Sequence, residues 1–256
     1  MSEAVELHHV VDGPAGAPVL VLAGSLGSTL EMWRPQVAAL SESYRIVRLD
    51  HRGHGGSPVP PGPYRMADLA GDVLALLDRL ELSTVAWCGL SLGGMVGMYL
   101  GSTAPERLTS LTLCCTTAHF PDPTPWVERI AAVREGGTEP IADSVVARWF
   151  TPEFAAAHPD QVKECRDMVA DTDDAGYLAS CQAIQVWDHR DQLPSVAVPT
   201  LVIGGAGDMS MPVGPHARML VENIPGARLE VVPGAHLATI EEADRTSALI
   251  GAHAAT

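Results

Sequence analysis

The sequence predicts an α/β fold: a mostly parallel, doubly wound sheet with an inserted helical cap. Short apolar runs alternate along the chain with longer amphipathic stretches, which is typical of strands that are each followed by a covering helix. A parallel sheet of this kind is buried on both faces. Between Thr116 and about Ser195 the alternation stops, and several prolines divide the chain. We therefore expect a core formed by residues 1–117 and 196–256, and a helical cap subdomain of residues 118–195.

Strands and helices are expected where the hydrophobic pattern has the matching period. Apolar and β-branched runs predict strands at Val5–Val11, Val19–Ala23, Arg45–Leu49, Val85–Cys88, Leu108–Cys114, Leu201–Ile203 and Leu229–Val232. Apolar residues at helical spacing predict helices at about Met32–Leu40, Met66–Leu80, Leu92–Thr103, Val213–Val221 and Glu241–His253. In the cap we expect several short helices broken by Pro123, Pro125, Pro140, Pro152 and Pro159.

Composition limits the class of protein. At 256 residues, with 46% hydrophobic and 18% charged residues, the chain is typical of one globular domain or of a core with an insertion. No apolar run approaches the roughly 20 residues that span a bilayer, and no secretory signal pattern is present, so we expect a cytoplasmic protein. The net charge of −15 argues against nucleic acid or an anionic membrane as a partner. An anionic small-molecule substrate would need a local cationic group.

Neither a metal nor a cofactor is expected. The five cysteines are an odd number and form no CxxC pair, which favours buried free thiols over a redox or metal role. His51 and His54 lie close together after a predicted strand, but no second cluster of carboxylates or cysteines completes a metal site. A structured loop at the end of the strand is the better interpretation.

Ser91 is the candidate nucleophile. It lies in Gly89-Leu90-Ser91-Leu92-Gly93, directly after a predicted strand and directly before a predicted helix. In this context GxSxG forms a nucleophile elbow, because the flanking glycines let the backbone turn sharply and present the hydroxyl. In a chain with 24 glycines the motif can also be only a glycine-rich turn, so the other catalytic groups decide between the two.

Those groups follow in the required order. An activated serine needs a base and a carboxylate that orients the base, each on a loop after a late strand. Asp208 follows the sixth predicted strand and His236 follows the seventh, which favours Ser91, Asp208 and His236 as a catalytic triad. Weaker candidates for the acid, at the end of the cap or within a strand, are Asp188, Asp191 and Glu230.

An oxyanion hole needs two backbone N–H groups aimed at the developing negative charge. One is expected from Leu92, the residue after the nucleophile. The other is expected from the loop after the predicted strand Val19–Ala23, where Leu26 is the candidate.

These residues resemble the α/β-hydrolase superfamily along the whole chain, and within it the 3-oxoadipate enol-lactonases. The matching segments are Gly24–Trp33, Asp50–Pro58, Cys88–Met98, Trp126–Gly137 and Arg148–Phe154. The last two lie in the expected cap and are more specific, because caps vary with substrate. The chain departs from the family pattern around the acid, where Met209 and Met211 would reshape the pocket.

The resemblance implies a serine hydrolase that opens the lactone ring of 3-oxoadipate enol-lactone through an acyl-enzyme, in the degradation of aromatic compounds. It implies a substrate carboxylate, for which Arg129, on one helix face with Trp126, is the predicted partner. Ser25 and Trp149 are the other predicted substrate contacts. Alternatively, Trp126 packs the cap onto the core and Arg129 is a surface residue. The next candidates for the cation are Arg134 and Arg148.

Other functions remain open at this stage. A carboxylesterase, a C–C bond hydrolase of ring-cleavage products or a tailoring hydrolase of a biosynthetic cluster would carry the same triad on the same fold. A non-catalytic binding protein would be expected to have a broken triad or oxyanion loop, and this sequence keeps both. The sequence makes no prediction of the oligomeric state.

Overall fold

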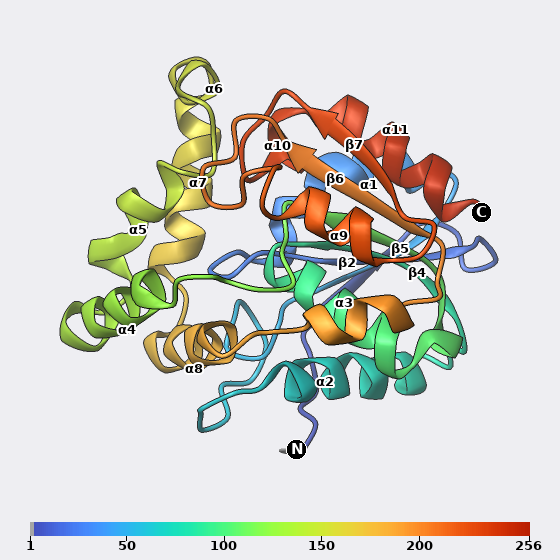
Figure 1. Cartoon of the computed structure of the whole chain (residues 1–256), viewed down its shortest axis with the longest axis horizontal. Helices are drawn as coiled ribbons and strands as arrows, with labels where there is room; N and C mark the ends of the chain where they lie inside the picture. The colour runs from blue at the N-terminus through green and yellow to red at the C-terminus, as the bar shows by residue number, and fades with distance from the viewer. Residues whose placement is uncertain (1–2) are drawn as a thin grey trace.

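A computed structural model describes residues 3–256 and has a seven-stranded sheet at its centre (Figure 1). The strand order is β1-β3-β2-β4-β5-β6-β7, with β1 antiparallel to β3 and all other neighbours parallel. The predicted α/β class is therefore confirmed. The strands are β1 (His9–Asp12), β2 (Val19–Ala23), β3 (Arg45–Leu49), β4 (Val85–Leu90), β5 (Leu108–Cys114), β6 (Thr200–Gly205) and β7 (Arg228–Val232).

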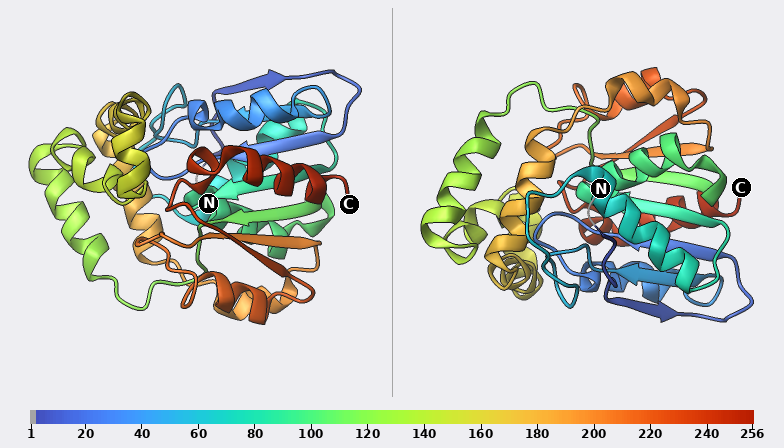
Figure 2. Two further views of the ribbon diagram at one scale, coloured as in Figure 1. Left: turned by 90° about the horizontal axis from the view of Figure 1, so that it is seen from above. Right: turned by 90° about the horizontal axis from the view of Figure 1, so that it is seen from below.

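Helices cover both faces of the sheet (Figure 2). On one face α1 (Arg34–Leu40) packs against α11 (Ala243–Ala254), and on the other α2 (Met66–Arg79) packs against α3 (Leu92–Thr103). Because of this double cover, β4 is buried along its whole length. Further helical segments of the core are η1 (Leu30–Trp33), η2 (Pro105–Arg107), α9 (Ala217–Asn223) and α10 (Ala238–Glu241). Within residues 3–256, no helix has the length and apolar character to cross a membrane.

β1 is shorter than the predicted strand Val5–Val11. The N–H of Val5 donates to Asp72 Oδ1 at 2.8 Å, and the N–H of His8 donates to Ser57 Oγ at 2.9 Å. Side chains thus satisfy the backbone ahead of β1 in place of a neighbouring strand, and the sheet ladder starts later.

Local breaks in the backbone explain the helices that differ from prediction. The predicted helix Met32–Leu40 is divided into η1 and α1, with Pro35 in the first turn of α1. Helix α9 begins later than the predicted start at Val213: Pro215 has no N–H to donate, and the N-cap residue His216, with φ −113° and ψ −71°, lies outside the regular helix. The predicted helix Glu241–His253 is α10 and α11, separated at Glu242, whose φ of −115° and ψ of 47° are not helical.

Most of the segment between β5 and β6 is helical and lies beyond one end of the sheet, whereas its last helical turn, η3 (Arg190–Ser195), packs against α3 and α9 (Figures 1 and 2). The segment contains α4 (Thr124–Gly136), α5 (Glu139–Val146), α6 (Pro152–Ala157), α7 (Pro159–Ala170), α8 (Asp174–Gln185) and η3. Its prolines mostly occupy first helical turns, where a missing N–H breaks no bond. They therefore start the helices that they were predicted to separate. We keep the division into a core and a cap as a proposal and call this segment the cap.

Candidate active site

Ser91 lies on a sharp turn between β4 and α3. Its φ of 56° and ψ of −110° fall in a region that side chains disfavour. The two glycines of the motif are required by close backbone contacts: a Cβ on Gly89 would lie 2.1 Å from the carbonyl oxygen of Gly93, and one on Gly93 would lie 2.1 Å from that of Ala23. The Ser91 N–H donates to the carbonyl of Cys114 at 2.9 Å, which fixes the turn against β5. The motif is thus an elbow with a defined direction for the hydroxyl.

Asp208 and His236 are brought together by the loops after β6 and β7. His236 Nδ1 lies 2.8 Å from Asp208 Oδ2, and both side chains are buried. The N–H groups of Ser210 and Met211 donate to Asp208 Oδ1 at 2.8 and 2.9 Å. Burial alone would raise the pKa of Asp208, but His236 and these N–H groups outweigh burial and lower it below its ordinary value. The carboxylate is therefore ionised at neutral pH and can orient the imidazole.

The other carboxylates considered for the acid lie elsewhere. Asp188 is half exposed and forms an ion pair with Arg190 at 2.7 Å. Asp191 is exposed in η3, and Glu230 lies within β7. The geometry favours Asp208 as the partner of His236.

The two predicted oxyanion donors lie where neighbouring N–H groups are already bonded. Gly27 N–H donates to His54 Nε2 at 2.9 Å, and Gly93 N–H donates to the carbonyl of Gly24 at 2.9 Å. In the described part of the chain, no hydrogen bond engages the N–H of Leu26 or Leu92. Leu92 is the first residue of α3, whose N–H has no partner inside the helix. Both groups are free to bind a ligand oxygen.

A cavity of about 210 Å³ lies between the core and the cap, and it contains both Ser91 and His236. All four predicted substrate contacts line it: Ser25, Trp126, Arg129 and Trp149. Leu26 lines it as well. Of the other lining residues, the sequence had singled out Arg148, Met209 and Met211, whereas Phe120, Asp122, Pro125, Val145 and Ser210 were not predicted.

The two methionines flagged in the sequence both line the cavity, but in different ways. Met211 is buried, whereas Met209 is 78% exposed. Met209 thus contributes to the mouth of the cavity and Met211 to its wall. Phe120 carried no periodic signal, since it lies between β5 and α4, where it packs edge-on against Trp126 with ring centroids 5.2 Å apart.

Two arginines of the cap give the cavity its positive charge. The Arg129 guanidinium carbon lies 5.1 Å from the centre of the Trp126 ring, as a cation–π contact. Neither Arg129 nor Arg148 makes an ion pair within residues 3–256. Burial, and then the charge of Arg129, lowers the pKa of Arg148, although an arginine keeps its charge at neutral pH. Arg134 is exposed and does not line the cavity.

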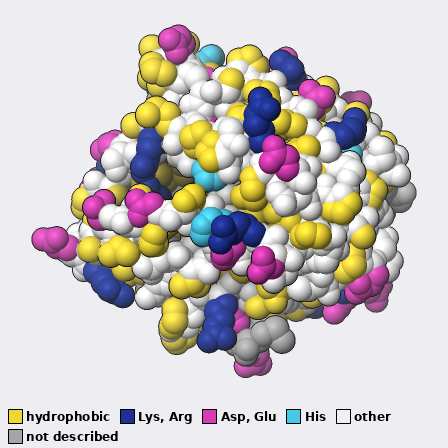
Figure 3. Space-filling view, viewed as in Figure 1, with side chains coloured by type: hydrophobic (Ala, Val, Ile, Leu, Met, Phe, Trp, Pro, Cys, Tyr) yellow, Lys and Arg dark blue, Asp and Glu magenta, His cyan; other side chains and the backbone are white. Residues whose placement is uncertain are grey.

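The charge inside the cavity contrasts with the outer surface. On the face shown in Figure 3, acidic, basic and hydrophobic side chains are interspersed, with no large patch of one kind.

Tyr177 lies deep beside the arginines: burial raises its pKa to about 12, and the charges of Arg129 and Arg148 oppose that rise. Its hydroxyl is close to Arg129 but makes no hydrogen bond of normal geometry. Two neighbouring cations without a counter-ion form a local anion-binding environment in an acidic protein.

The residues considered for a metal have other roles. All five cysteines are buried free thiols, as predicted. His51 Nε2 lies 3.2 Å from the carbonyl of Gly24, and His54 accepts from Gly27, so both histidines hold a loop. Among residues 3–256 there is no group of three or more His, Cys, Asp or Glu side chains placed to hold a metal ion.

Comparisons with known proteins agree with this geometry. Residues 17–243 match the α/β-hydrolase fold family. The chain is 36% identical to 3-oxoadipate enol-lactonase 2 of Acinetobacter baylyi, over 94% of this chain and 90% of that protein. It superposes on the crystal structure of the enol-lactonase from Burkholderia xenovorans LB400 with a TM-score of 0.96 and 39% identity, covering 98% of this chain and 97% of that one. A Klebsiella pneumoniae protein that carries the name carbamate hydrolase RutD is 30% identical over 92% of this chain and 90% of its own length.

Proposed function

Because this chain belongs to the α/β-hydrolase family and is a hydrolase of esters or lactones, we propose that it opens the lactone ring of 3-oxoadipate enol-lactone. The observation that carries the proposal is one cavity holding Ser91, His236 and two arginines that have no counter-ion. Ser91 and His236 support acyl-transfer chemistry, and the two arginines support a substrate that bears a carboxylate. Similarity to enol-lactonases over nearly the whole chain supports the choice of lactone.

In the proposed mechanism, Ser91 Oγ attacks the lactone carbonyl carbon while His236 Nε2 takes the hydroxyl proton. The carbonyl oxygen becomes an oxyanion, which the N–H groups of Leu26 and Leu92 stabilise. Asp208, 2.8 Å from His236 Nδ1, holds the imidazole in one tautomer and stabilises its protonated form.

Collapse of this intermediate breaks the ring C–O bond. The leaving enol oxygen takes the proton from His236, and the chain remains attached to Ser91 as an acyl ester. Ketonisation of the enol removes the internal nucleophile that would reclose the ring. His236 then deprotonates a water molecule, which attacks the acyl carbon; on collapse the Ser91 Oγ–acyl bond breaks, protonated His236 returns the proton to Ser91 Oγ, and 3-oxoadipate is released.

Specificity in this proposal comes from the cap. Arg129 binds the substrate carboxylate, and the indole of Trp126 beneath it faces the flat unsaturated ring. Arg148 adds a second positive charge to the same wall. A protein with a net charge of −15 repels an anion at long range, so this local charge is needed to hold one.

The test is turnover of the enol-lactone measured beside a neutral aryl ester and an aryl carbamate. We expect the largest kcat/KM for the enol-lactone and labelling by a fluorophosphonate that requires Ser91. Faster turnover of the neutral ester would indicate a general carboxylesterase, and faster turnover of the carbamate would indicate a carbamate hydrolase. Failure of the fluorophosphonate to label the wild-type protein would overturn the serine mechanism itself.

A further inference from the structure

The loop that carries the oxyanion donor Leu26 is held by a second loop, which follows β3. The second loop contacts it at three points. His51 Nε2 lies 3.2 Å from the carbonyl of Gly24, His54 Nε2 accepts the Gly27 N–H at 2.9 Å, and Asp50 Oδ1 accepts the Leu30 N–H at 2.6 Å. The loop that carries Leu26 is thus fixed by side chains that do not line the cavity.

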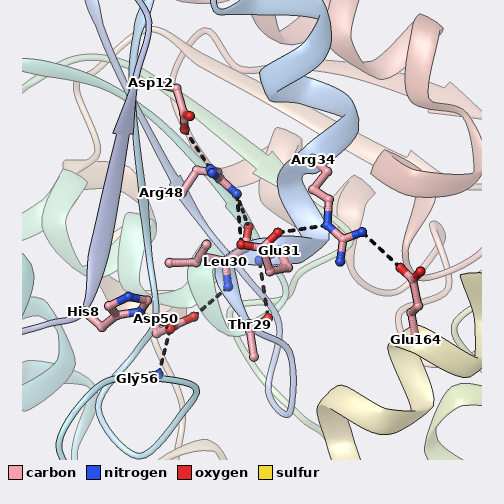
Figure 4. A network of polar contacts seen from close by, with 10 residues as sticks. All are labelled: His8, Asp12, Thr29, Leu30, Glu31, Arg34, Arg48, Asp50, Gly56 and Glu164. Carbon is pink, nitrogen blue, oxygen red and sulfur yellow. Dashed lines mark hydrogen bonds and ion pairs between the residues drawn. The ribbon is translucent and has the colours of Figure 1, made fainter.

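Asp50 anchors the second loop itself. Figure 4 shows its carboxylate among Leu30, Gly56 and His8. Besides Leu30, Asp50 Oδ2 accepts the Gly56 N–H at 3.0 Å and lies 2.7 Å from His8 Nδ1. Because Asp50 is buried and bonded on several sides, its loop is a rigid support.

The hydrogen bonds of His54 specify a single protonation state. Its Nε2 accepts from the Gly27 N–H and so carries no proton, and its Nδ1 lies 3.2 Å from the carbonyl of Arg52, which can only accept. The ring is therefore neutral with its proton on Nδ1. Burial lowers the pKa of His54, although the Arg52 carbonyl and Asp50 oppose the shift. The ring faces Asp50 on one side and His51, whose ring centroid lies 6.3 Å away in an edge-on contact, on another.

The Gly27 N–H that His54 binds sits next to the proposed oxyanion donor in the chain. Gly27 has a φ of 76°, and a Cβ there would lie 3.0 Å from the ring of Tyr177. The hydrogen bond from Gly27 to His54 fixes the peptide between Leu26 and Gly27. That peptide flanks the Leu26 Cα on one side and so restrains the peptide on the other side, which carries the Leu26 N–H; this N–H is left without a protein acceptor in the described residues.

We propose that His54 is a positioning residue: as a neutral Nδ1–H imidazole, it holds the Gly27 N–H so that the Leu26 N–H faces the oxyanion. This inference rests on the proposed function, because it assumes that Leu26 stabilises a tetrahedral intermediate. His54 does not touch the substrate. Its effect is to keep the donor aimed before the reaction begins, and electrostatic stabilisation in active sites depends on such preorganisation.

Two amide variants separate this role from a purely structural one. In His54→Gln the amide oxygen takes the place of Nε2 and can still accept from Gly27. In His54→Asn the amide nitrogen takes the place of Nδ1, and the acceptor is lost. We expect His54→Asn to lower kcat for an aryl ester by about 10- to 100-fold with KM changed less than about threefold, because one oxyanion donor is misaligned. His54→Gln should recover most of this loss, and His9→Asn, on β1, should match the wild type.

A second measurement tests the geometry of the transition state. Binding of phenylboronic acid, whose adduct with Ser91 is tetrahedral, should weaken in His54→Asn by the same factor as kcat. Equal kcat in His54→Asn and wild type, or equal losses in the Asn and Gln variants, would overturn the proposal. If the His54→Asn variant does not fold, ¹⁵N NMR of the wild type tests the proposal instead. A proton found on Nε2 of His54 would overturn the proposal, because Nε2 could then not accept from the Gly27 N–H.

Fluorophosphonate labelling keeps this inference distinct from the proposed function. A wild-type protein that is not labelled at Ser91 rejects the serine mechanism, and the inference falls with it. A wild-type protein that is labelled, with His54→Asn labelled at the same rate, rejects only the role of His54.

Discussion

The core and cap sides of the cavity are built in opposite ways. On the core side, each proposed catalytic group is held by buried hydrogen bonds: Asp208 accepts from His236, Ser210 and Met211, and the Ser91 turn is bonded to β5. On the cap side, Arg129 and Arg148 have no ion-pair partner within residues 3–256. The core groups are fixed before a ligand arrives, whereas, under the proposed function, the ligand would neutralise the cap cations.

This difference suggests that chemistry and specificity can be changed separately. A substitution on the core side should affect all substrates alike, because every acyl transfer uses the same groups. A substitution of a cap arginine should affect only substrates that carry a negative charge. Variants of the two sides can test this separation.

The largest effect is expected from Ser91→Ala. Hydrolysis of every ester or lactone substrate should fall by at least about 10⁴-fold, because the nucleophile is absent. His236→Ala should be nearly as damaging, and the double variant little worse than either, since the triad acts as a unit. Values of kcat/KM, with circular dichroism to establish folding, check this. Losses that multiply in the double variant would mean that the two residues do not share one step.

Asp208→Asn comes next. The amide keeps the shape but no longer favours the required tautomer of His236, so kcat should fall by about 10³- to 10⁴-fold for charged and neutral substrates alike. Steady-state kinetics on the enol-lactone and on an aryl ester provide the measurement. If the loss were smaller than about tenfold, another carboxylate would have to orient His236.

Arg129→Ala should separate the two sides of the cavity. Loss of the cation should raise the activation free energy for the enol-lactone by about 2 to 4 kcal/mol, the usual cost of removing one member of a desolvated charge pair. A neutral aryl ester should be hardly affected. Arg134→Ala, on the exposed face of the same helix, is the matched control and should change neither substrate. Equal losses on both substrates would assign Arg129 to packing, and Arg148 would be tested next.

Glu241 joins the two sides, so its replacement should give the smallest and least selective effect. Its carboxylate accepts from the N–H of Ala235 at 3.0 Å, beside His236, and from the N–H of Thr151 at 3.2 Å, at the start of α6 in the cap. The Thr151 hydroxyl also donates to it. Glu241→Gln should lower the free energy of unfolding by about 1 to 2 kcal/mol, because these bonds to a charged acceptor weaken.

The kinetic signature of Glu241→Gln is a decrease of similar size, within about tenfold, for charged and neutral substrates. Glu242→Gln, one residue along the chain, is the control and should behave as wild type. A loss confined to the charged lactone would place Glu241 with the specificity residues of the cap and contradict its role in joining the two sides of the cavity.

The core side could be predicted from the sequence because its determinants are local. The tight turn at Ser91 requires Gly89 and Gly93, whose side-chain positions are occupied by backbone, so the motif is visible in five consecutive residues. Asp208 lies on the short loop after β6 and His236 on the short loop after β7, and parallel strands end at the same edge of the sheet. The roles of these residues in catalysis stay predictions until they are tested.

The cap side was less predictable because its contacts join residues that are distant in sequence. Trp126 and Arg129 share a helix, and helical spacing was enough to predict their contact. Arg148 lies on the turn after α5, and only the tertiary fold shows that it reaches the same cavity and lacks a counter-ion. The shortness of β1 has a similar origin. Asp72 and Ser57, both distant in sequence, accept hydrogen bonds from the backbone just before β1.

The backbone at Ser91 has a consequence for the evolution of this protein. A φ of 56° with a ψ of −110° costs a residue with a side chain about 1 to 3 kcal/mol, whereas glycine adopts this conformation without that cost. Even after allowing for the greater disorder of glycine in the unfolded chain, a glycine at position 91 should melt at a higher temperature than an alanine. If Ser91 is the nucleophile, the position whose backbone geometry favours glycine must nevertheless carry a side chain, so the reaction is maintained at a cost in stability.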